Sequence, residues 1–228
     1  VSRGLGDVYK RQASVNPALP AERQFDRHVA VRAARLAEGH IGIAKLYASD
    51  TQVMSDRDEL IVGLLGLCRA SDAVLLADDL IDTAKSQAEA DVNRQAAVAE
   101  ADFRRINGLG EQDRIPPKLR GAYNAIAKKD EIKRQATRRS RDVLDRALNS
   151  AASIYRDIAV LQNNAEDAVG LINMENRTAI AELSARLSRQ EVVDRLEAIA
   201  VARKRLLGNG NPMLVFEALF CALIPGRL

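Results

Sequence analysis

The sequence predicts an all-α protein, and three observations support this prediction. The 228 residues are rich in Ala, Leu, Arg, Asp and Glu, which lose little side-chain freedom in a helix. Thr, Tyr and Phe are scarce, and no run of β-branched residues alternates with polar ones as in a half-buried strand. Apolar residues instead recur every three or four positions. We expect one small helical bundle followed by a larger one.

The overall charge gives no signature of nucleic-acid binding. The chain has 34 Lys and Arg against 31 Asp and Glu, a net charge of +3, of which the first twelve residues contribute two. Four Phe, four Tyr and no Trp leave few rings for stacking on bases. The high pI of about 9.0 is therefore not evidence for a nucleic-acid partner.

The cysteines and the apolar runs indicate the compartment. Cys68 and Cys221 lie far apart in apolar runs, which gives neither a metal-ligand spacing nor a disulfide framework. We expect two buried thiols in a reducing compartment. No apolar run approaches the length of a membrane span. The sequence thus favours a cytoplasmic protein.

The first twelve residues fit no helical pattern. Residues 2–12, SRGLGDVYKRQ, are similar to the translation of a transposon-type sequencing adapter, and the chain begins without Met. We therefore expect residues 1–12 to be a disordered, adapter-derived scar, and the natural reading frame to continue upstream of Ala13.

The following residues predict a pair of helices and a buried third one. Residues 21–38 have one apolar face and are stopped by Gly39, and residues 41–48 form a shorter helix. Residues 50–58 are polar and are interpreted as a linker. Residues 59–68 are apolar almost all round, which predicts a buried helix.

A long antiparallel helical hairpin is predicted next, over about residues 71–163. The outgoing helix spans residues 71–106 and has a narrow, Ala-rich apolar stripe that suits close pairing with one other helix. Glycines end it, and Pro116 and Pro117 open the return helix from Lys118.

The C-terminal part predicts two more helices. Ser188 and Glu191 have the spacing of a capping box ahead of an apolar run. A Gly-Asn-Gly break follows, and Asn211 and Pro212 start a last helix over residues 213–224. That helix is apolar on every side, which places it in a core or an interface.

Residues 137–162, TRRSRDVLDRALNSAASIYRDIAVLQ, carry a more specific signal. The order T-R-x-x-R-D-x-L-D-R-A-L followed by Y-R-D resembles the C-terminal collar domain of bacterial DNA polymerase III δ′ subunits, in their actinobacterial form. The segment from Asn211, N-P-x-L-x-x-E-A-L, is similar to the final collar helix. In that family δ′ is a non-motor subunit of the clamp loader, which places the sliding clamp on primed DNA.

A second resemblance lies at the end of the first predicted helix. Residues 39–44, Gly39-His40-Ile41-Gly42-Ile43-Ala44, resemble the lid motif of clamp-loader AAA+ subunits in its δ′ variant. Motor subunits have an Arg that touches nucleotide where this chain has Gly42. Without a guanidinium, this lid cannot form the charge-assisted bond to phosphate.

The resemblance implies a partial lid domain over residues 13–50 and a collar over residues 51–228. It implies a scaffold and stator within a hetero-oligomeric ring, with no active site, cofactor or metal, and with DNA and clamp reached only indirectly. The DNA polymerase activity of the holoenzyme is not carried by this chain. The ring interface is expected to involve the apolar residues of the last helix: Leu214, Phe216, Leu219, Phe220 and Leu223.

Two other functions remain open. Asp78, Asp79 and Asp82 form a DDxxD pattern, typical of the Mg²⁺-diphosphate site of all-α isoprenyl diphosphate synthases. That family also needs a basic stretch just downstream and a second Asp-rich motif, and neither occurs here, so a solvated acidic face is the simpler interpretation. A helical adaptor is the other alternative, although no sustained heptad occurs outside the hairpin.

The returning helix also carries a basic cluster. It consists of Lys133, Arg134, Arg138, Arg139 and Arg141. The cluster could contact DNA phosphates or an acidic partner. Acidic residues such as Asp142 and Asp145 interleave with it, as i,i+4 pairing on a solvated helix face would require. The sequence therefore favours a solvated helix face over a contact with DNA.

Overall fold

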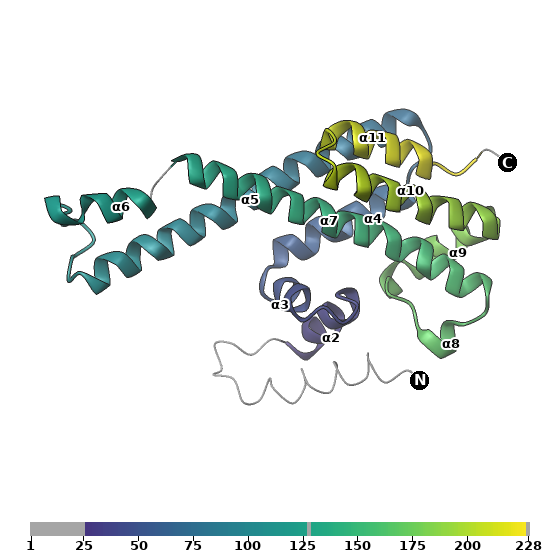
Figure 1. Cartoon of the computed structure of the whole chain (residues 1–228). Coiled ribbons are helices and arrows are strands. Elements are labelled where there is room, and N and C mark those ends of the chain that lie inside the picture. The colour runs from purple at the N-terminus through teal and green to yellow at the C-terminus, as the bar shows by residue number, and fades with distance from the viewer. Residues whose placement is uncertain (1–25, 127–128, 227–228) are drawn as a thin grey trace. The chain divides into compact units, whose positions relative to one another are not determined.

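The computed structural model describes residues 26–126 and 129–226, without the side chains of residues 126–131. Every regular element in these ranges is helical, which confirms the all-α prediction (Figure 1). The expectations for residues 1–12 lie outside the described residues.

The chain divides into two compact units, the first formed by residues 1–77 and 147–228 and the second by residues 78–146. The helices wholly within the first unit are α2 (Arg27–Leu36), α3 (Ile41–Ser49), α4 (Thr51–Leu65), α8 (Glu166–Val169), the 3₁₀ turn η4 (Met174–Asn176), α9 (Arg177–Arg186), α10 (Arg189–Leu207) and α11 (Pro212–Leu223). The second unit holds η3 (Pro117–Leu119) and α6 (Arg120–Ile126), while α5 (Ala70–Ile106) and α7 (Lys129–Gln162) contribute to both units.

A tight turn joins α2 to α3. The Asp26 carboxylate caps α2 by accepting a hydrogen bond from the His28 amide at 2.7 Å. After the helix, Glu38 and Gly39 have φ angles of +48° and +91°. Two successive residues in the left-handed region reverse the chain, and glycine adopts this region without the strain that a Cβ causes. The turn sets the direction in which α3 begins.

The predicted linker over residues 50–58 is wrong, because these residues form the N-cap and first half of α4. The Asp50 carboxylate accepts hydrogen bonds from the amides of Gln52 and Val53, at 3.1 and 3.2 Å. Polar residues at this point therefore start a helix rather than leave the chain irregular. α4 is continuous from Thr51 to Leu65.

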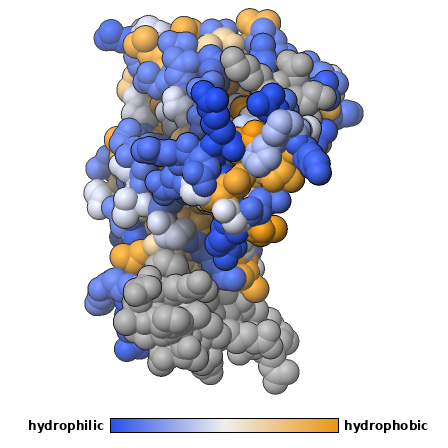
Figure 2. Space-filling model, turned by 90° about the vertical axis from the view of Figure 1, so that its left-hand side faces the viewer, coloured by the Kyte–Doolittle hydropathy of each residue, from blue (hydrophilic) through white to orange (hydrophobic). Residues whose placement is uncertain are grey.

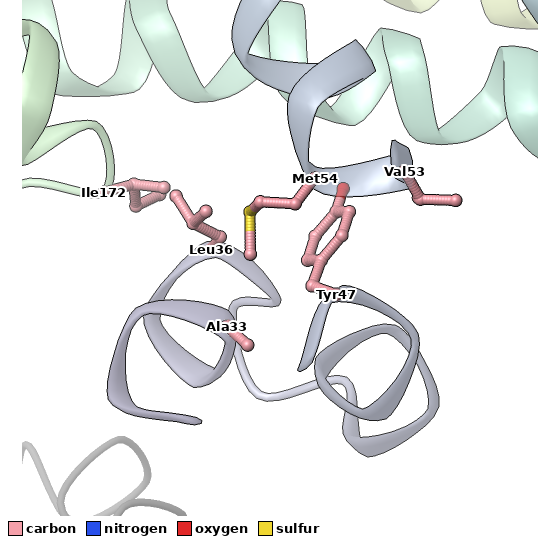
Figure 3. Close-up of a cluster of buried hydrophobic side chains, with 6 residues drawn as sticks. All are labelled: Ala33, Leu36, Tyr47, Val53, Met54 and Ile172. Carbon is pink, nitrogen blue, oxygen red and sulfur yellow. The ribbon is translucent and has the colours of Figure 1, made fainter. Parts of the chain in front are cut away.

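A hydrophobic cluster packs α2 and α3 against α4 (Figure 3). Its buried members are Ala33, Leu36, Tyr47, Val53, Met54 and Ile172. Figure 3 shows Leu36, Met54 and Ile172 pointing toward one another, although Ile172 comes from the segment before η4. The cluster thus joins the N-terminal helices to a segment more than a hundred residues later in the chain.

The C-terminal helices of the first unit begin at the predicted caps. The Ser188 hydroxyl accepts a hydrogen bond from the Glu191 amide at 3.2 Å, and the Glu191 carboxylate accepts one from the Ser188 amide at 2.8 Å, which confirms the capping box. Asn211 caps α11 through the Met213 amide. The buried rings of Phe216 and Phe220 pack with centroids 5.5 Å apart.

The expectation of two buried thiols is wrong. Cys68 follows α4 and Cys221 lies on α11, and both are exposed. Apolar neighbours in the sequence do not bury Cys68, which lies in the loop between α4 and α5, or Cys221, which α11 turns away from the core. On α11 the same effect exposes Leu214, Ala218 and Ala222.

The second unit is an antiparallel hairpin built on α5 and α7. Arg139 lies 3.3 Å from Asp91, and the Arg146 guanidinium donates to the Gln87 side chain at 3.2 Å. The buried residues of the seam are small or aliphatic: Leu80, Ile81, Ala84, Ala88, Val92 and Leu144. The Ala-rich seam suits the close pairing of two helices that the sequence predicts.

Candidate functional site

The most extensive constellation of polar side chains in the described structure lies in the first unit. We call it the polar junction: it links α2, α4 and α7 to the segment of residues 169–175. Its members are Arg32, Arg35, Arg57, Asp58, Ser153, Arg156, Asp157, Asn173 and Glu175.

Asp157, on α7, is at the centre of the junction and is fully buried. Its carboxylate accepts hydrogen bonds from the backbone amides of Ile172 and Asn173, at 2.9 and 2.7 Å, and from the Asn173 side chain at 2.9 Å. Arg156 adds a contact at 2.8 Å and also donates to the Gly170 carbonyl at 2.6 Å. The carboxylate thereby satisfies backbone groups that would otherwise be unpaired in the interior.

Arg57 brings α4 into the same network. Its side chain is 5% exposed and donates to the Asn173 side-chain oxygen at 2.7 Å. Burial lowers the pKa of the Arg57 guanidinium from its ordinary value. Its Nε has no hydrogen-bond partner among the described residues. The guanidinium is therefore held by its position between α4 and the loop rather than by full pairing.

The outer part of the junction consists of ion pairs from α2. Arg32 lies 2.6 Å from Asp58 and 3.1 Å from Glu175, while Arg35 pairs with Glu175 and donates to the Ile172 carbonyl. Burial raises the pKa of Glu175, but the hydrogen bond from Arg35 and the two positive charges outweigh it, so the pKa of this carboxyl is lowered. These contacts fix α2 to η4.

This arrangement suits holding a loop rather than transferring a proton. Asp157, Glu175 and Asp58 are each occupied by N–H donors from within the chain, and positive and negative charges alternate through the network. Sequence reasoning used Asp157 only as part of a signature and missed Arg57 altogether. A charged pair within an apolar stripe, Arg156 and Asp157 beside Tyr155, was the available signal.

The lid-like motif lies at the start of α3. Ala44 is buried, whereas Ile41 is 58% exposed and Gly42 is also exposed. A Cβ built on Gly42 would approach only the His40 ring, at 3.5 Å, an ordinary van der Waals distance. The position thus has room for a side chain, and packing does not require glycine there.

The apolar residues of α11 separate into two groups. Phe216, Leu219, Phe220 and Leu223 are buried within the chain itself. Leu214 is 63% exposed and lies on one face with Ala218, Cys221 and Ala222, spaced four, seven and eight residues along the helix. We call these four residues the α11 strip. Of the five apolar residues predicted to form the ring interface, Leu214 is the exposed one.

The acidic pattern on α5 forms an exposed face. Asp78, Asp79 and Asp82 are exposed, and Asp82 pairs with Lys85 at 3.0 Å. Within the described residues, no group of three His, Cys, Asp or Glu side chains has a geometry that could hold a metal ion.

The basic cluster lies on the first part of α7. Lys133, Arg134, Arg138, Arg139 and Arg141 are all exposed. Arg139 pairs with Asp91 across the hairpin, with side chains that are 46% and 37% exposed. The cluster and the acidic pattern both belong to the second unit, whereas the residues of the polar junction belong to the first.

The sequence matches no protein-family model, and no significant similarity links it to a curated protein or to a solved structure. Among the described helices, none combines the length and the apolar character that crossing a lipid bilayer requires.

Proposed function

We propose that the chain is a non-catalytic clamp-loader subunit of the δ′ type. It acts as a scaffold and stator in a hetero-oligomeric ring that loads the sliding clamp during DNA replication. Its partners are other clamp-loader subunits, and it uses no cofactor of its own. The nucleotide chemistry takes place on other subunits.

The observation that carries the proposal is the δ′-like string on α7. Its apolar members are buried: Leu144, Leu148, Ala151, Tyr155 and Ile158. Its polar members, Arg156 and Asp157, hold the segment of residues 170–173. Residues of the string that resemble the family thus have clear structural roles here. A family signature that reflects a shared fold is expected to consist of residues with such structural roles.

The polar junction supports a scaffold role. It ties α2, which precedes the lid-like motif, to α4, α7 and η4 through several ion pairs and buried hydrogen bonds. A stator must transmit the position of one helical group to another without yielding. A network of hydrogen bonds and ion pairs restricts such motion more than apolar contacts alone, because its hydrogen bonds are directional.

The α11 strip supports association with a neighbouring subunit. Five buried residues fix α11 in place from one side, so the strip on its other side is held in a defined orientation. The Leu214 side chain is 63% exposed in the isolated chain, and its burial by a partner would contribute favourably to the free energy of association. We therefore assign the ring contact to Leu214 and the strip, and a supporting role to the buried phenylalanines.

Reconstitution tests this proposal. The chain is mixed with the remaining subunits of an actinobacterial clamp loader, and the complexes are measured by native mass spectrometry. We expect one copy of the chain per ring, and loss of incorporation for Leu214→Asp with an unchanged melting temperature. Leu207→Asp is the matched control, because Leu207 ends α10 and is 80% exposed. Failure of the wild-type chain to join, or equal incorporation of both variants, would contradict the proposal.

A further inference from the structure

Basic residues are concentrated in one part of the chain, which we call the distal hairpin, residues 94–141. It contains thirteen Lys and Arg against six Asp and Glu, whereas in the rest of the chain the acidic residues outnumber the basic ones. The near-neutral overall charge therefore hides a strongly positive segment. Local charge, rather than the total, determines the potential that a partner meets within a Debye length.

Most charged residues of the distal hairpin whose side chains are described face solvent. From Asn93 to Val143, no residue whose side chain is described is buried. Four of these cations are exposed and form no ion pair with a described acidic residue: Lys118 in η3, Arg120 at the start of α6, and Lys133 and Arg138 on α7. Figure 2, which shows the side on which α6 lies, has mostly hydrophilic residues with smaller hydrophobic patches.

Several of the acidic groups of the distal hairpin are occupied by its own structure. Glu100 accepts hydrogen bonds from the Arg104 guanidinium at 3.1 Å and from the Tyr123 hydroxyl at 2.7 Å. Asp113 accepts one from the Gly110 amide at 2.6 Å, and Asp102 pairs with Arg105. Internal pairing thus uses acidic groups while leaving an excess of cations on the surface.

The aromatic residues of the distal hairpin serve its internal packing. The rings of Phe103 and Tyr123 lie 5.8 Å apart, and Arg104 lies over the Tyr123 ring. Their contacts hold α6 against the end of α5. Single-strand binding surfaces need free rings on which bases stack, and these rings are engaged with each other. The chemistry of this surface therefore suits phosphates rather than bases.

We propose that the described basic residues of the distal hairpin, on η3, α6 and the part of α7 from Lys133 onward, bind the phosphate backbone of double-stranded nucleic acid without reading its sequence. Arg134, Arg138 and Arg141 share one face of α7, roughly one turn of about 5.4 Å apart. A duplex offers a dense row of negative charges to such a row of cations, and binding releases condensed counterions. This surface lies in a different unit from the α11 strip, and the proposal does not depend on the ring assignment.

The test is the salt dependence of binding by the full chain to a fluorescent 20-base-pair duplex, measured by anisotropy. We expect a Kd on the order of 1–100 μM near physiological salt, and a slope of log K against log salt of about −3 to −5. Arg134→Gln with Arg138→Gln should make the slope less negative by about 2, because two phosphate contacts of that row are lost. Lys204→Gln with Arg205→Gln, on α10, removes the same charge and should leave the slope unchanged.

Each other outcome overturns the proposal. Equal effects of the two double variants would show attraction by the whole chain rather than by this surface. Tighter binding to a single strand than to the duplex would refute the backbone-only mode. Binding to vesicles of phosphatidylserine and phosphatidylcholine, without binding to the duplex, would identify a membrane surface instead. Circular dichroism of both variants checks that they fold. The reconstitution experiment tests the ring assignment, and its outcome does not affect this proposal.

Discussion

The two units of this chain are built from the same kind of helix but are held together differently. The first unit buries large side chains such as Ile61, Ile158 and Phe216, and it adds the buried polar junction. The second unit has an aliphatic seam between α5 and α7, whose buried residues reach Val92 on α5 and start at Leu144 on α7. Beyond that seam, no side chain that the structure describes is buried.

The comparison shows how helices persist where a core does not. In the distal hairpin, local pairs such as Glu100 with Arg104 and Asp102 with Arg105 support the helix that they belong to. Each such pair contributes only a few tenths of a kcal/mol. Such a segment keeps its helical form while its surface remains available for a partner. The first unit, in contrast, is a frame whose position is fixed by its interior.

The largest expected difference comes from the same substitution in each unit. Phe216→Ala removes a fully buried ring and leaves a cavity, so we expect a loss of about 3–5 kcal/mol in the free energy of unfolding. Phe103 is only partly buried and contacts Tyr123, so Phe103→Ala should cost less than about 2 kcal/mol. Urea denaturation followed by circular dichroism measures both. Equal losses in the free energy of unfolding for the two variants would contradict the claim that the first unit has a core that the distal hairpin lacks.

A second pair of variants sharpens the comparison for charged groups. Asp157→Asn removes part of the acceptor capacity that serves buried donors, which should cost about 2–4 kcal/mol, since each unsatisfied donor costs about 1–3 kcal/mol. Asp91→Asn weakens an exposed pair with Arg139, for which about 0–1 kcal/mol is expected. The same denaturation experiment applies. A cost below that of Asp91→Asn would mean that Asp157 does not hold the loop.

The sequence predicts the helices well where local signals decide them. The caps at Ser188 and Asn211 are chemical features of a few neighbouring residues, and both are present in the structure. The linker prediction for residues 50–58 failed because part of the support for this helix comes from a distant segment of the chain. The first half of α4 is polar, and its Arg57 is buried by a partner 116 residues away in the sequence, which no local pattern shows.

The candidate sites were less predictable than the helices. On α11, an apolar helix gave no indication of which side the chain itself would cover, so Leu214 and Phe216 could not be separated before the structure placed them. The polar junction depends on Asp157 meeting residues 172 and 173 through a tertiary contact. The charge excess of the distal hairpin, in contrast, can be counted directly once the limits of the hairpin are known.

The most direct test of the central claim, that this chain is part of a δ′-type clamp-loader subunit, is the sequence of the genomic DNA upstream of the codon for Ala13. If the chain is of the δ′ type, we expect an open reading frame that continues in frame upstream of this codon and encodes an AAA+ core. An in-frame start codon close to Ala13 would contradict it. So would an upstream region that encodes any other fold.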